Sequence, residues 1–393
     1  MSKSVKILDL GIHPFADTFI KKKQLNLSEP IFPLECYLDT SSFIIYNSIK
    51  TNEIQRYNLY DYSYTSSNSS ISKNYWKEYF KAILKNYELN TKSKILEIGS
   101  NDGYLINLFK KKTNNILGVD ASNHMTQIAN KKKIRSINMI FNNLNSKHIK
   151  KKYGKFDLII ANNVLNHSND PLDFVKGVEN ILSKNGCFIF ELPYWYELVR
   201  SKRFDQIYHE HVSYLTAKSS YYLLKKYGLQ IEKIEMTPYH GGSIRVHAKK
   251  SKKVQKKVFL KKIILIEEKS KLFEIKTYKN LMLHLQKKKI NFLKKIINYK
   301  SKNYTIVGIG AAAKANTFLN FIGLNNSIID FITDASKYKI GKYTPLTRIP
   351  IFADRKLGTV KKKICAIPLA WNISNLLKGK IKKINKKIKF INF

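Results

Sequence analysis

The chain has 393 residues and a formal net charge of +43, and 44% of its residues are hydrophobic and 12% aromatic. This length allows two or three domains with a sizeable core, and the composition excludes a disordered chain. Lysine doublets and triplets are spread along the whole chain without an aromatic-rich recognition motif, so we expect a solvated basic surface and no nucleic-acid partner.

The three cysteines, Cys36, Cys187 and Cys365, lie far apart in the sequence. Their spacing excludes a disulfide framework and a Cys-x-x-Cys zinc site. No apolar run approaches the ~20 residues that a membrane span needs, and the N-terminus lacks the apolar core of a signal peptide. We therefore expect a cytoplasmic protein without a membrane partner.

Residues 1–70 contain short strands and turns, at 7–11, 32–34 and 42–46. They are too few for a core of their own, and we expect them to pack on the following domain. Aromatic and aliphatic residues then recur every four positions between 71 and 90, which predicts an amphipathic helix.

A buried strand at 95–98 leads into a sharp turn that contains Gly99 and Gly103. Glycine allows backbone conformations and a close approach that a side chain would block. The next strand, 116–119, ends in Asp120, where a carboxylate can accept hydrogen bonds from a ribose diol. This βαβ pattern predicts a site for a nucleotide-containing cofactor.

The details of this turn favour S-adenosylmethionine over NAD. The phosphate fingerprint Gly-x-Gly-x-x-Gly is absent, because Ser100 and Asn101 occupy its middle. Glu97, just before the turn, would repel a pyrophosphate and suits the positively charged methionine end of S-adenosylmethionine. The strand at 156–161 ends in Asn162 and Asn163, at the edge where an open α/β sheet binds ligands, and His167 follows in the same loop.

Tyr208, His209, Glu210 and His211 occupy four consecutive positions behind an apolar strand. Such side chains suit proton transfer, because histidine exchanges protons near neutral pH and a phenol or carboxylate can orient it. A glycine turn at 240–243 lies between two predicted strands, where its backbone amides could meet a substrate.

Residues 250–300 are lysine-rich with apolar residues at helical spacing, which predicts one or two connecting helices. A third unit opens with Gly-x-Gly-x-x-Ala at 308–313, and Asp334 follows the next predicted strand, 328–332. This pattern fits a nucleotide diphosphate, NAD, or helix–strand packing alone. Lys314 and Asn316 could serve an anion of another kind.

Several motifs occur in a fixed order along the chain: Tyr-x-Tyr-x-Ser-Ser at 62–67, Glu-Ile-Gly-Ser-Asn-Asp-Gly at 97–103, Ala-Asn-Asn-Val at 161–164, Glu-Leu-Pro-Tyr at 191–194, Tyr-His-Glu-His at 208–211, His-Gly-Gly-Ser-Ile-Arg at 240–245 and Gly-Ala-Ala-Ala-Lys-Ala-Asn-Thr at 310–317. This set resembles the nucleotide-sugar C-methyltransferases of deoxysugar biosynthesis, and the likeness covers nearly the whole chain. The Tyr-His-Glu-His and His-Gly-Gly-Ser motifs are the most specific.

The resemblance implies an α/β protein with a central class I (Rossmann-like) S-adenosylmethionine-dependent methyltransferase domain. A small N-terminal zinc-binding module precedes it, and a C-terminal Rossmann-like domain helps to hold a nucleotide sugar. We expect boundaries at 1–70, 71–250, 251–300 for the helical connector, and 301–393.

The chemistry implied by the resemblance is removal of a proton next to a 4-keto group, followed by methylation of the enolate. By position, His211 is the base, and Tyr208 and Glu210 orient it or polarise the keto oxygen. The cofactor residues are Glu97, Gly99, Asn101, Gly103, Asp120, Asn162 and Asn163. The substrate residues are Tyr194, His209, His240, Gly241, Arg245, Lys314 and Asn316.

The N-terminal module departs from the family pattern. Asp39 and Ser42 stand where the family has cysteines, and Cys36 cannot form a metal site alone. We therefore expect no zinc. The alternatives to C-methylation are O- or N-methylation of a related sugar or small metabolite, and a non-catalytic protein that binds NAD or a nucleotide sugar.

Overall fold

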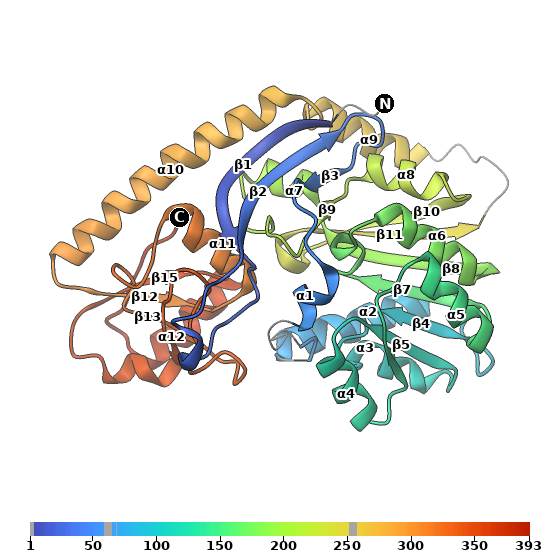
Figure 1. Ribbon diagram of the computed structural model, residues 1–393, viewed down its shortest axis with the longest axis horizontal. Coiled ribbons are helices and arrows are strands. Elements are labelled where there is room, and N and C mark those ends of the chain that lie inside the picture. Colours follow the sequence, from blue (N-terminus) through green and yellow to red (C-terminus); the bar gives the residue numbers. More distant parts are fainter. Residues whose placement is uncertain (1–3, 59–64, 68, 251–257) are drawn as a thin grey trace.

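The computed structural model describes residues 4–58, 65–67, 69–250 and 258–393. Figure 1 shows two α/β units side by side, with strands β1 and β2 running between them and the long helix α10 lying along the upper edge of the C-terminal unit. Each unit has its own sheet, and the N-terminal strands form a third.

The central unit contains a seven-stranded sheet in the order β10-β11-β8-β7-β4-β5-β6. Strands β4 to β8 are parallel, and β11 is antiparallel to both β8 and β10. The strands are β4 (Ile95–Ile98), β5 (Ile116–Asp120), β6 (Ser136–Asn138), β7 (Phe156–Asn162), β8 (Leu182–Pro193), β10 (Leu229–Thr237) and β11 (Ser243–Lys250). The strand order reverses between β4 and β7, which opens a crevice at their carboxyl ends.

Helices cover both faces of this sheet, because its buried strands carry apolar side chains on both sides. One face packs against α2 (Ser70–Asn86), α3 (Tyr104–Leu108) and α4 (Asn123–Lys131). The other packs against α5 (Asn143–Tyr153), α6 (Pro171–Ile181) and α8 (Ala217–Lys225). This arrangement confirms the α/β, Rossmann-like fold expected from the sequence.

The N-terminal sheet has the order β1-β2-β3-β9. Strands β1 (Ser4–Pro14), β2 (Ile31–Asp39) and β3 (Ile45–Asn47) come from the N-terminal 50 residues, but β9 (Ser213–Tyr214) comes from the central unit. The short helix α1 (Glu53–Asn58) follows β3. The N-terminal segment is therefore built into the central unit and not only attached to its surface.

The C-terminal unit follows helices α9 (Val258–Lys269) and α10 (Ile275–Ser301). Its parallel five-stranded sheet has the order β14-β13-β12-β15-β16. The elements are β12 (Thr305–Ile309), α11 (Ala313–Ile322), β13 (Phe331–Asp334), β14 (Ile351–Ala353), β15 (Ile364–Pro368), α12 (Ser374–Ile384) and β16 (Lys389–Phe390). The remaining short helices are α7 (Trp195–Arg200) and 3-10 turns at Lys22–Gln24, Phe109–Lys111, Leu165–His167, Tyr239–Gly241, Asp354–Thr359 and Trp371–Ile373.

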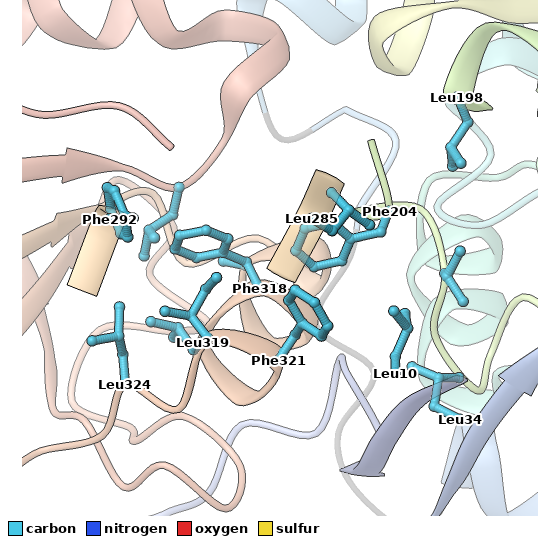
Figure 2. Packing of buried hydrophobic residues seen from close by; sticks show 14 of the residues in the cluster. Leu10, Leu34, Leu198, Phe204, Leu285, Phe292, Phe318, Leu319, Phe321 and Leu324 are labelled. Carbon is cyan, nitrogen blue, oxygen red and sulfur yellow. The ribbon is translucent and has the colours of Figure 1, made fainter. Parts of the chain in front are cut away.

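One apolar core joins the N-terminal sheet, α7, α10 and the C-terminal unit (Figure 2). Leu10 and Leu34 from the N-terminal strands share it with Phe318 of α11 and Leu285 of α10. Phe204, just before the Tyr-His-Glu-His stretch, lies in the same core with its ring centroid 4.5 Å from that of Phe321. The N-terminal strands therefore pack on the C-terminal unit as well as on the domain that follows them.

Helix α8 ends at Lys225, and Gly228 has a φ of +68° in the turn behind it. Asp334 is the last residue of β13, which begins three residues later than expected. Residues 62–64 of the Tyr-x-Tyr-x-Ser-Ser motif lie outside the described residues.

Helix α10 is long but carries many lysines, and among the described helices none has the apolar stretch required to span a bilayer.

The connector helix α9 is attached to the central unit through one buried carboxylate. Glu267 accepts hydrogen bonds from the Tyr194 hydroxyl (2.7 Å) and from the first two amides of α8, Ala217 N (2.6 Å) and Lys218 N (3.0 Å). Amides in the first turn of a helix lack intrahelical partners, and a negative charge there interacts favourably with the helix dipole. Glu267 thus connects α9, α8 and the end of β8.

We expect Glu267→Ala to lower the free energy of unfolding by roughly 2–4 kcal/mol, because it leaves buried amides and a hydroxyl without an acceptor. The matched control is Glu268→Ala, whose exposed carboxylate makes an ion pair with Lys218, and which we expect to cost less than about 0.5 kcal/mol. Denaturant unfolding of both variants measures the difference. Equal costs would contradict the role of Glu267.

Candidate active site

A cavity of ≈ 640 Å³ lies where the carboxyl ends of the parallel strands of the central and C-terminal sheets face each other. The central unit lines it with Ile98, Asp120 and Asn162, at the ends of β4, β5 and β7. The C-terminal unit lines it with Ile309 and Asp334, at the ends of β12 and β13. One cavity therefore has access to both predicted binding turns.

The first turn has the geometry of a close-contact cofactor site. Gly99 has a φ of +72°, and a Cβ there would lie 2.9 Å from the Cβ of Val164. Asn101 has a φ of +50°, and its amide donates to the Asp120 carboxylate over 2.7 Å. Gly103 has a φ of +77° at the start of α3 and does not line the cavity. It faces the protein interior, where an added Cβ would meet Ile134.

Two carboxylates lie at this turn. Burial raises the pKa of Glu97 well above its usual range, although its carboxylate accepts the Ile106 amide at 2.9 Å. Burial also raises the pKa of Asp120 to about 6, opposed by hydrogen bonds from the amides of Ser122 and Asn101. Both line the cavity, so they can receive hydrogen bonds from a ligand.

The remaining cofactor residues also reach the cavity. Asn163 has a φ of +53°, and its buried side-chain oxygen has no hydrogen-bond partner among the described residues. Asn162 lies beside it, and apolar residues Met139 and Phe141 line the cavity nearby. A diol acceptor at Asp120, an unpaired amide oxygen and an apolar wall fit the ribose, amino acid and adenine parts of S-adenosylmethionine.

His211 and Tyr208 form a hydrogen-bonded pair in the cavity wall. The His211 Nδ1 lies 2.8 Å from the backbone oxygen of Gln206, which can only accept, so Nδ1 carries the proton. The His211 Nε2 is then an acceptor and receives the Tyr208 hydroxyl over 2.6 Å. Burial lowers the pKa of His211 to about 3, which leaves a neutral imidazole with its lone pair at Nε2.

A second histidine adjoins this pair. The ring of His167 lies 4.9 Å from that of His211, and its Nδ1 is 3.1 Å from the Tyr57 hydroxyl. Burial and the neighbouring His211 lower the pKa of His167. The sequence had indicated His167 only as part of the loop after Asn163, and Tyr57 carried no motif.

Glu210 holds the N-terminal segment against the cavity. Its carboxylate accepts hydrogen bonds from the amides of Ala16 (3.2 Å) and Asp17 (2.9 Å). Burial outweighs these bonds and raises the pKa of Glu210 to about 7. Asn316 donates its side-chain amide to the Ala16 oxygen (2.5 Å), so the same segment is also bound by α11.

Several predicted substrate residues lie outside the cavity wall, which corrects their expected role. His209 is buried beneath the N-terminal strands, with Nε2 3.2 Å from the Phe32 oxygen. Tyr194 donates to Glu267, and Asn316 donates to Ala16. These groups already have internal partners, and the cavity does not reach them.

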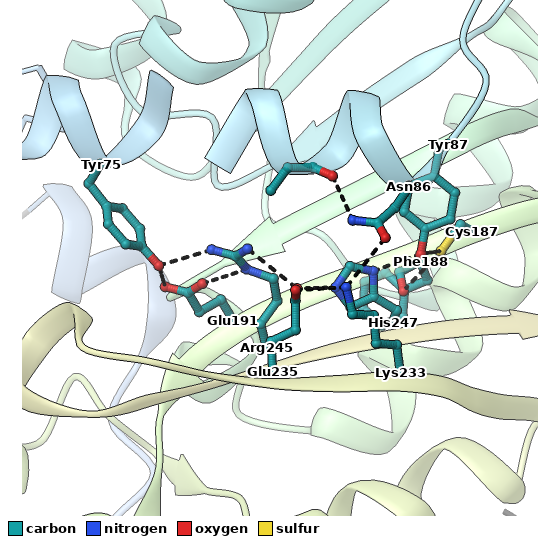
Figure 3. Close-up of polar contacts among 11 residues, drawn as sticks. Tyr75, Asn86, Tyr87, Cys187, Phe188, Glu191, Lys233, Glu235, Arg245 and His247 are labelled. Atoms are coloured by element: carbon teal, nitrogen blue, oxygen red, sulfur yellow. Dashed lines mark hydrogen bonds and ion pairs between the residues drawn. The ribbon is translucent and has the colours of Figure 1, made fainter. Parts of the chain in front are cut away.

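Arg245 is likewise directed into the protein and not into the cavity (Figure 3). Its guanidinium donates to Glu191 (2.8 Å) and to the Tyr75 hydroxyl (3.0 Å), and it lies 4.2 Å from the Tyr79 ring centroid. Figure 3 shows that Glu235 continues this network to His247. The network attaches α2 to strands β8, β10 and β11.

The glycine turn does not offer its amides to a substrate, contrary to expectation. The Gly241 amide donates to the Pro238 oxygen and the Gly242 amide to the Tyr239 oxygen. Gly241 does not line the cavity, and a Cβ there would lie 2.1 Å from Arg203. Its glycines serve close packing, whereas His240 lines the cavity.

The C-terminal wall contains the second glycine turn. Gly310 has a φ of +91°, and the Asp334 carboxylate accepts the Ala311 amide at 2.7 Å. Lys314 lines the cavity, where burial lowers its pKa, and its ammonium contacts Asn372 and lies 3.9 Å from Asp205. Lys314 and the amides at the start of α11 place positive charge at this wall, while the carboxylates of Asp334 and Asp205 lie beside them.

The described residues contain no group of three or more His, Cys, Asp or Glu that could hold a metal ion. In the N-terminal sheet, Asp39 accepts hydrogen bonds from the amides of Ser41 (2.7 Å) and Ser42 (3.1 Å). The turn between β2 and β3 is therefore closed by hydrogen bonds.

Two family models match this chain. Residues 72–234 match a methyltransferase domain model, and residues 238–392 match the C-methyltransferase C-terminal domain. The chain is 25% identical to C-methyltransferase NovU of Streptomyces niveus over 374 residues, covering 93% of this chain and 87% of NovU. The resemblance stated from the sequence is thereby confirmed.

Solved structures with a similar fold include magnesium protoporphyrin IX methyltransferase from Synechocystis PCC 6803 with bound S-adenosylmethionine, at 14% identity and a TM-score of 0.35, covering 46% of this chain and 79% of that one. Another is an S-adenosylmethionine-dependent methyltransferase from Clostridium acetobutylicum ATCC 824, at 19% identity and a TM-score of 0.35, covering 45% and 91%.

The raised pKa of Glu210 predicts a pH-dependent stability. The carboxyl has a usual pKa of 4.5 and about 7 when folded, so the folded state binds more protons between these values. Stability from this group is therefore present below pH 4.5 and is lost as the pH rises to about 7, by roughly 3 kcal/mol.

Glu210→Gln mimics the protonated carboxyl. We expect it to match the parent protein near pH 5 and to be more stable than the parent near pH 8, as measured by denaturant unfolding at both pH values. The difference between the two proteins cancels the titration of the buried histidines. A difference that does not change with pH would show that Glu210 titrates normally.

Proposed function

We propose that this S-adenosylmethionine-dependent methyltransferase, whose chain combines a methyltransferase domain with a C-methyltransferase C-terminal domain, methylates a carbon atom of a nucleotide-linked 4-keto deoxysugar. The observation that carries the proposal is the Tyr208–His211 pair in a cavity that both predicted binding turns line. The match to C-methyltransferase NovU supports carbon as the acceptor atom. The four-part division at residues 70, 250 and 300 is part of this proposal.

His211 is proposed as the base. Its Nε2 lone pair is unprotonated at neutral pH, and the Gln206 oxygen fixes the ring by accepting the Nδ1 proton. A carbon acid next to a ketone requires such a base and a group that stabilises the resulting oxyanion. When bound, S-adenosylmethionine supplies the electrophilic methyl group for the enolate carbon.

Tyr208 is proposed to orient His211 and to exchange its hydroxyl hydrogen bond when substrate binds. Burial and the nearby Glu210 raise the pKa of Tyr208 above its usual range, so it stays a phenol and can donate. Glu210 acts on the site mainly through Tyr208 and through the Ala16–Asp17 segment that it holds. Lys314 is proposed to contact the phosphate groups of the substrate.

The turn at Gly99 and the Asp120 carboxylate at the end of β5 are proposed to bind S-adenosylmethionine. The side chains of Glu97, Asn101, Asn162 and Asn163 are proposed to surround it. Zinc is not part of this proposal, because Asp39 and Ser42 stand where the resembled family has cysteines.

The test is incubation of the protein with a panel of nucleotide-linked 4-keto deoxysugars in heavy water, with and without S-adenosylmethionine, followed by mass spectrometry. We expect one sugar to gain a methyl group and, without the cofactor, to exchange one carbon-bound proton for deuterium. Methylation without exchange would instead indicate transfer to oxygen or nitrogen. Binding of NAD with no response to S-adenosylmethionine would overturn the proposal.

His211→Asn should bind S-adenosylmethionine with unchanged affinity and lose both methylation and deuterium exchange by about 100-fold or more, because the base is removed and the cofactor turn is untouched. His148→Asn, an exposed histidine on α5, is the matched control and should be fully active. Undiminished exchange in His211→Asn would rule out His211 as the base.

A further inference from the structure

Three cavity-lining residues other than glycine have a left-handed backbone, and two of them are the asparagines at the cofactor turns. The third is His240, with a φ of +53° and a ψ of +17°. Asparagine and histidine adopt this conformation more often than most residues with a side chain, but outside glycine it still carries a cost in backbone energy. A strained residue that persists in a cavity wall is a reason to look for function.

The backbone of His240 is fixed from several sides. Gln206 donates its side-chain amide to the His240 oxygen over 3.2 Å, and Arg203 donates to the Gly241 oxygen over 2.7 Å. The Tyr239 ring stacks on Tyr75 at 4.0 Å between centroids, with the planes 9° apart. The strain is therefore held by the surrounding structure.

Gln206 also fixes the proposed base. Its backbone oxygen accepts the His211 Nδ1 proton, while its side chain binds the His240 oxygen. One buried residue thus binds the imidazole of His211 and the backbone of His240, two residues that line the same cavity.

The His240 ring, in contrast to its backbone, is available to a ligand. No hydrogen bond to either ring nitrogen is found among the described residues. His240 lines the cavity and is only partly buried, and its ring centroid lies 4.2 Å from that of Tyr239. Burial, Lys314 and His211 together lower the pKa of His240 to about 3, so the ring is neutral and has one N–H to donate.

We propose that His240 donates a hydrogen bond to the substrate carbonyl oxygen while His211 removes the adjacent proton, and that Gln206 is the positioning residue for both. This inference rests on the proposed function and assigns a group to the oxyanion, for which the sequence had offered only Tyr208 and Glu210.

Enolate formation requires only groups of the protein and of the substrate. His211 Nε2 takes the proton, the C–H electron pair forms the carbon–carbon double bond, and the carbonyl π pair moves onto oxygen. The His240 N–H strengthens its hydrogen bond to that oxygen as charge develops. A neutral imidazole suits this role, because it stabilises the oxyanion without giving up its proton completely, as neutral histidine does in triosephosphate isomerase.

The closing experiment compares wild-type protein with His240→Asn and Gln206→Met. The probe is thymidine diphosphate 4-keto-6-deoxyglucose with ¹³C at the keto carbon. If wild-type protein exchanges another sugar of the panel faster than this one, that sugar, labelled in the same way, replaces it. Asparagine keeps the left-handed backbone, but its shorter side chain cannot reach the place of the distal imidazole nitrogen. Methionine fills the space of Gln206 and keeps its backbone oxygen for His211, but has no amide to hold His240.

We expect His240→Asn to slow deuterium exchange in the absence of S-adenosylmethionine by about 100-fold, which is typical of losing one oxyanion donor. The infrared stretch of the bound ¹³C carbonyl should shift to higher frequency, because the hydrogen bond that weakens it is lost. Gln206→Met should show a smaller change in the same direction in both measurements. All three proteins should bind S-adenosylmethionine equally.

An unchanged carbonyl frequency in His240→Asn would overturn the inference even if exchange were slower, since misplacement of the base alone slows exchange and leaves that frequency where it was. Exchange at the wild-type rate would overturn it as well. Wild-type protein that exchanges no sugar of the panel would overturn the proposed function, and the inference with it.

Discussion

The segment from Phe204 to Tyr214, part of the central unit, is bound by the N-terminal sheet and by helices α10 and α11, and the active-site geometry depends on this. Phe204 packs in the core shared with α10 and α11, and the Thr317 hydroxyl of α11 donates to the Ile207 oxygen at 3.0 Å. Asn47 of β3 donates its side-chain amide to the oxygens of both Tyr208 (3.0 Å) and His211 (2.8 Å). Because sheets and cores from different parts of the chain hold this segment, the proton-transfer groups cannot move independently of the fold.

A protein with a formal net charge of +43 has a cavity whose histidines are neutral. Solvent screens the exposed lysines, whereas burial penalises each imidazolium in the wall. The low pKa values leave His167, His211 and His240 without charge throughout the physiological range. This state suits a proton acceptor and a neutral hydrogen-bond donor in one site, while Lys314 supplies the positive charge near the C-terminal turn.

The sequence predicted the sheets and turns because apolar runs and glycines report directly on buried strands and positive φ. It did not predict which motif residues face the cavity. In β11, Ile244 and Val246 join one core, so alternation turns Arg245 to the opposite face, toward α2 and Glu191. That direction could have been read from the strand period. Gln206 could not have been identified in this way, because a lone polar residue outside any motif reveals its partners only when the chain is folded.

Hydrogen bonds and apolar packing hold the N-terminal sheet beside the site. Its fourth strand, β9, begins two residues after His211. Apolar residues of the sheet enter the core shared with the C-terminal unit. The amides of Ala16 and Asp17 satisfy the buried carboxylate of Glu210, and the Ala16 oxygen is bound by Asn316. Removing this sheet would expose Glu210 and take away part of the apolar core that the sheet shares with the C-terminal unit. Packing and main-chain hydrogen bonds thus give the sheet a fixed place beside the site, and its position is set by the groups that the proposed chemistry uses.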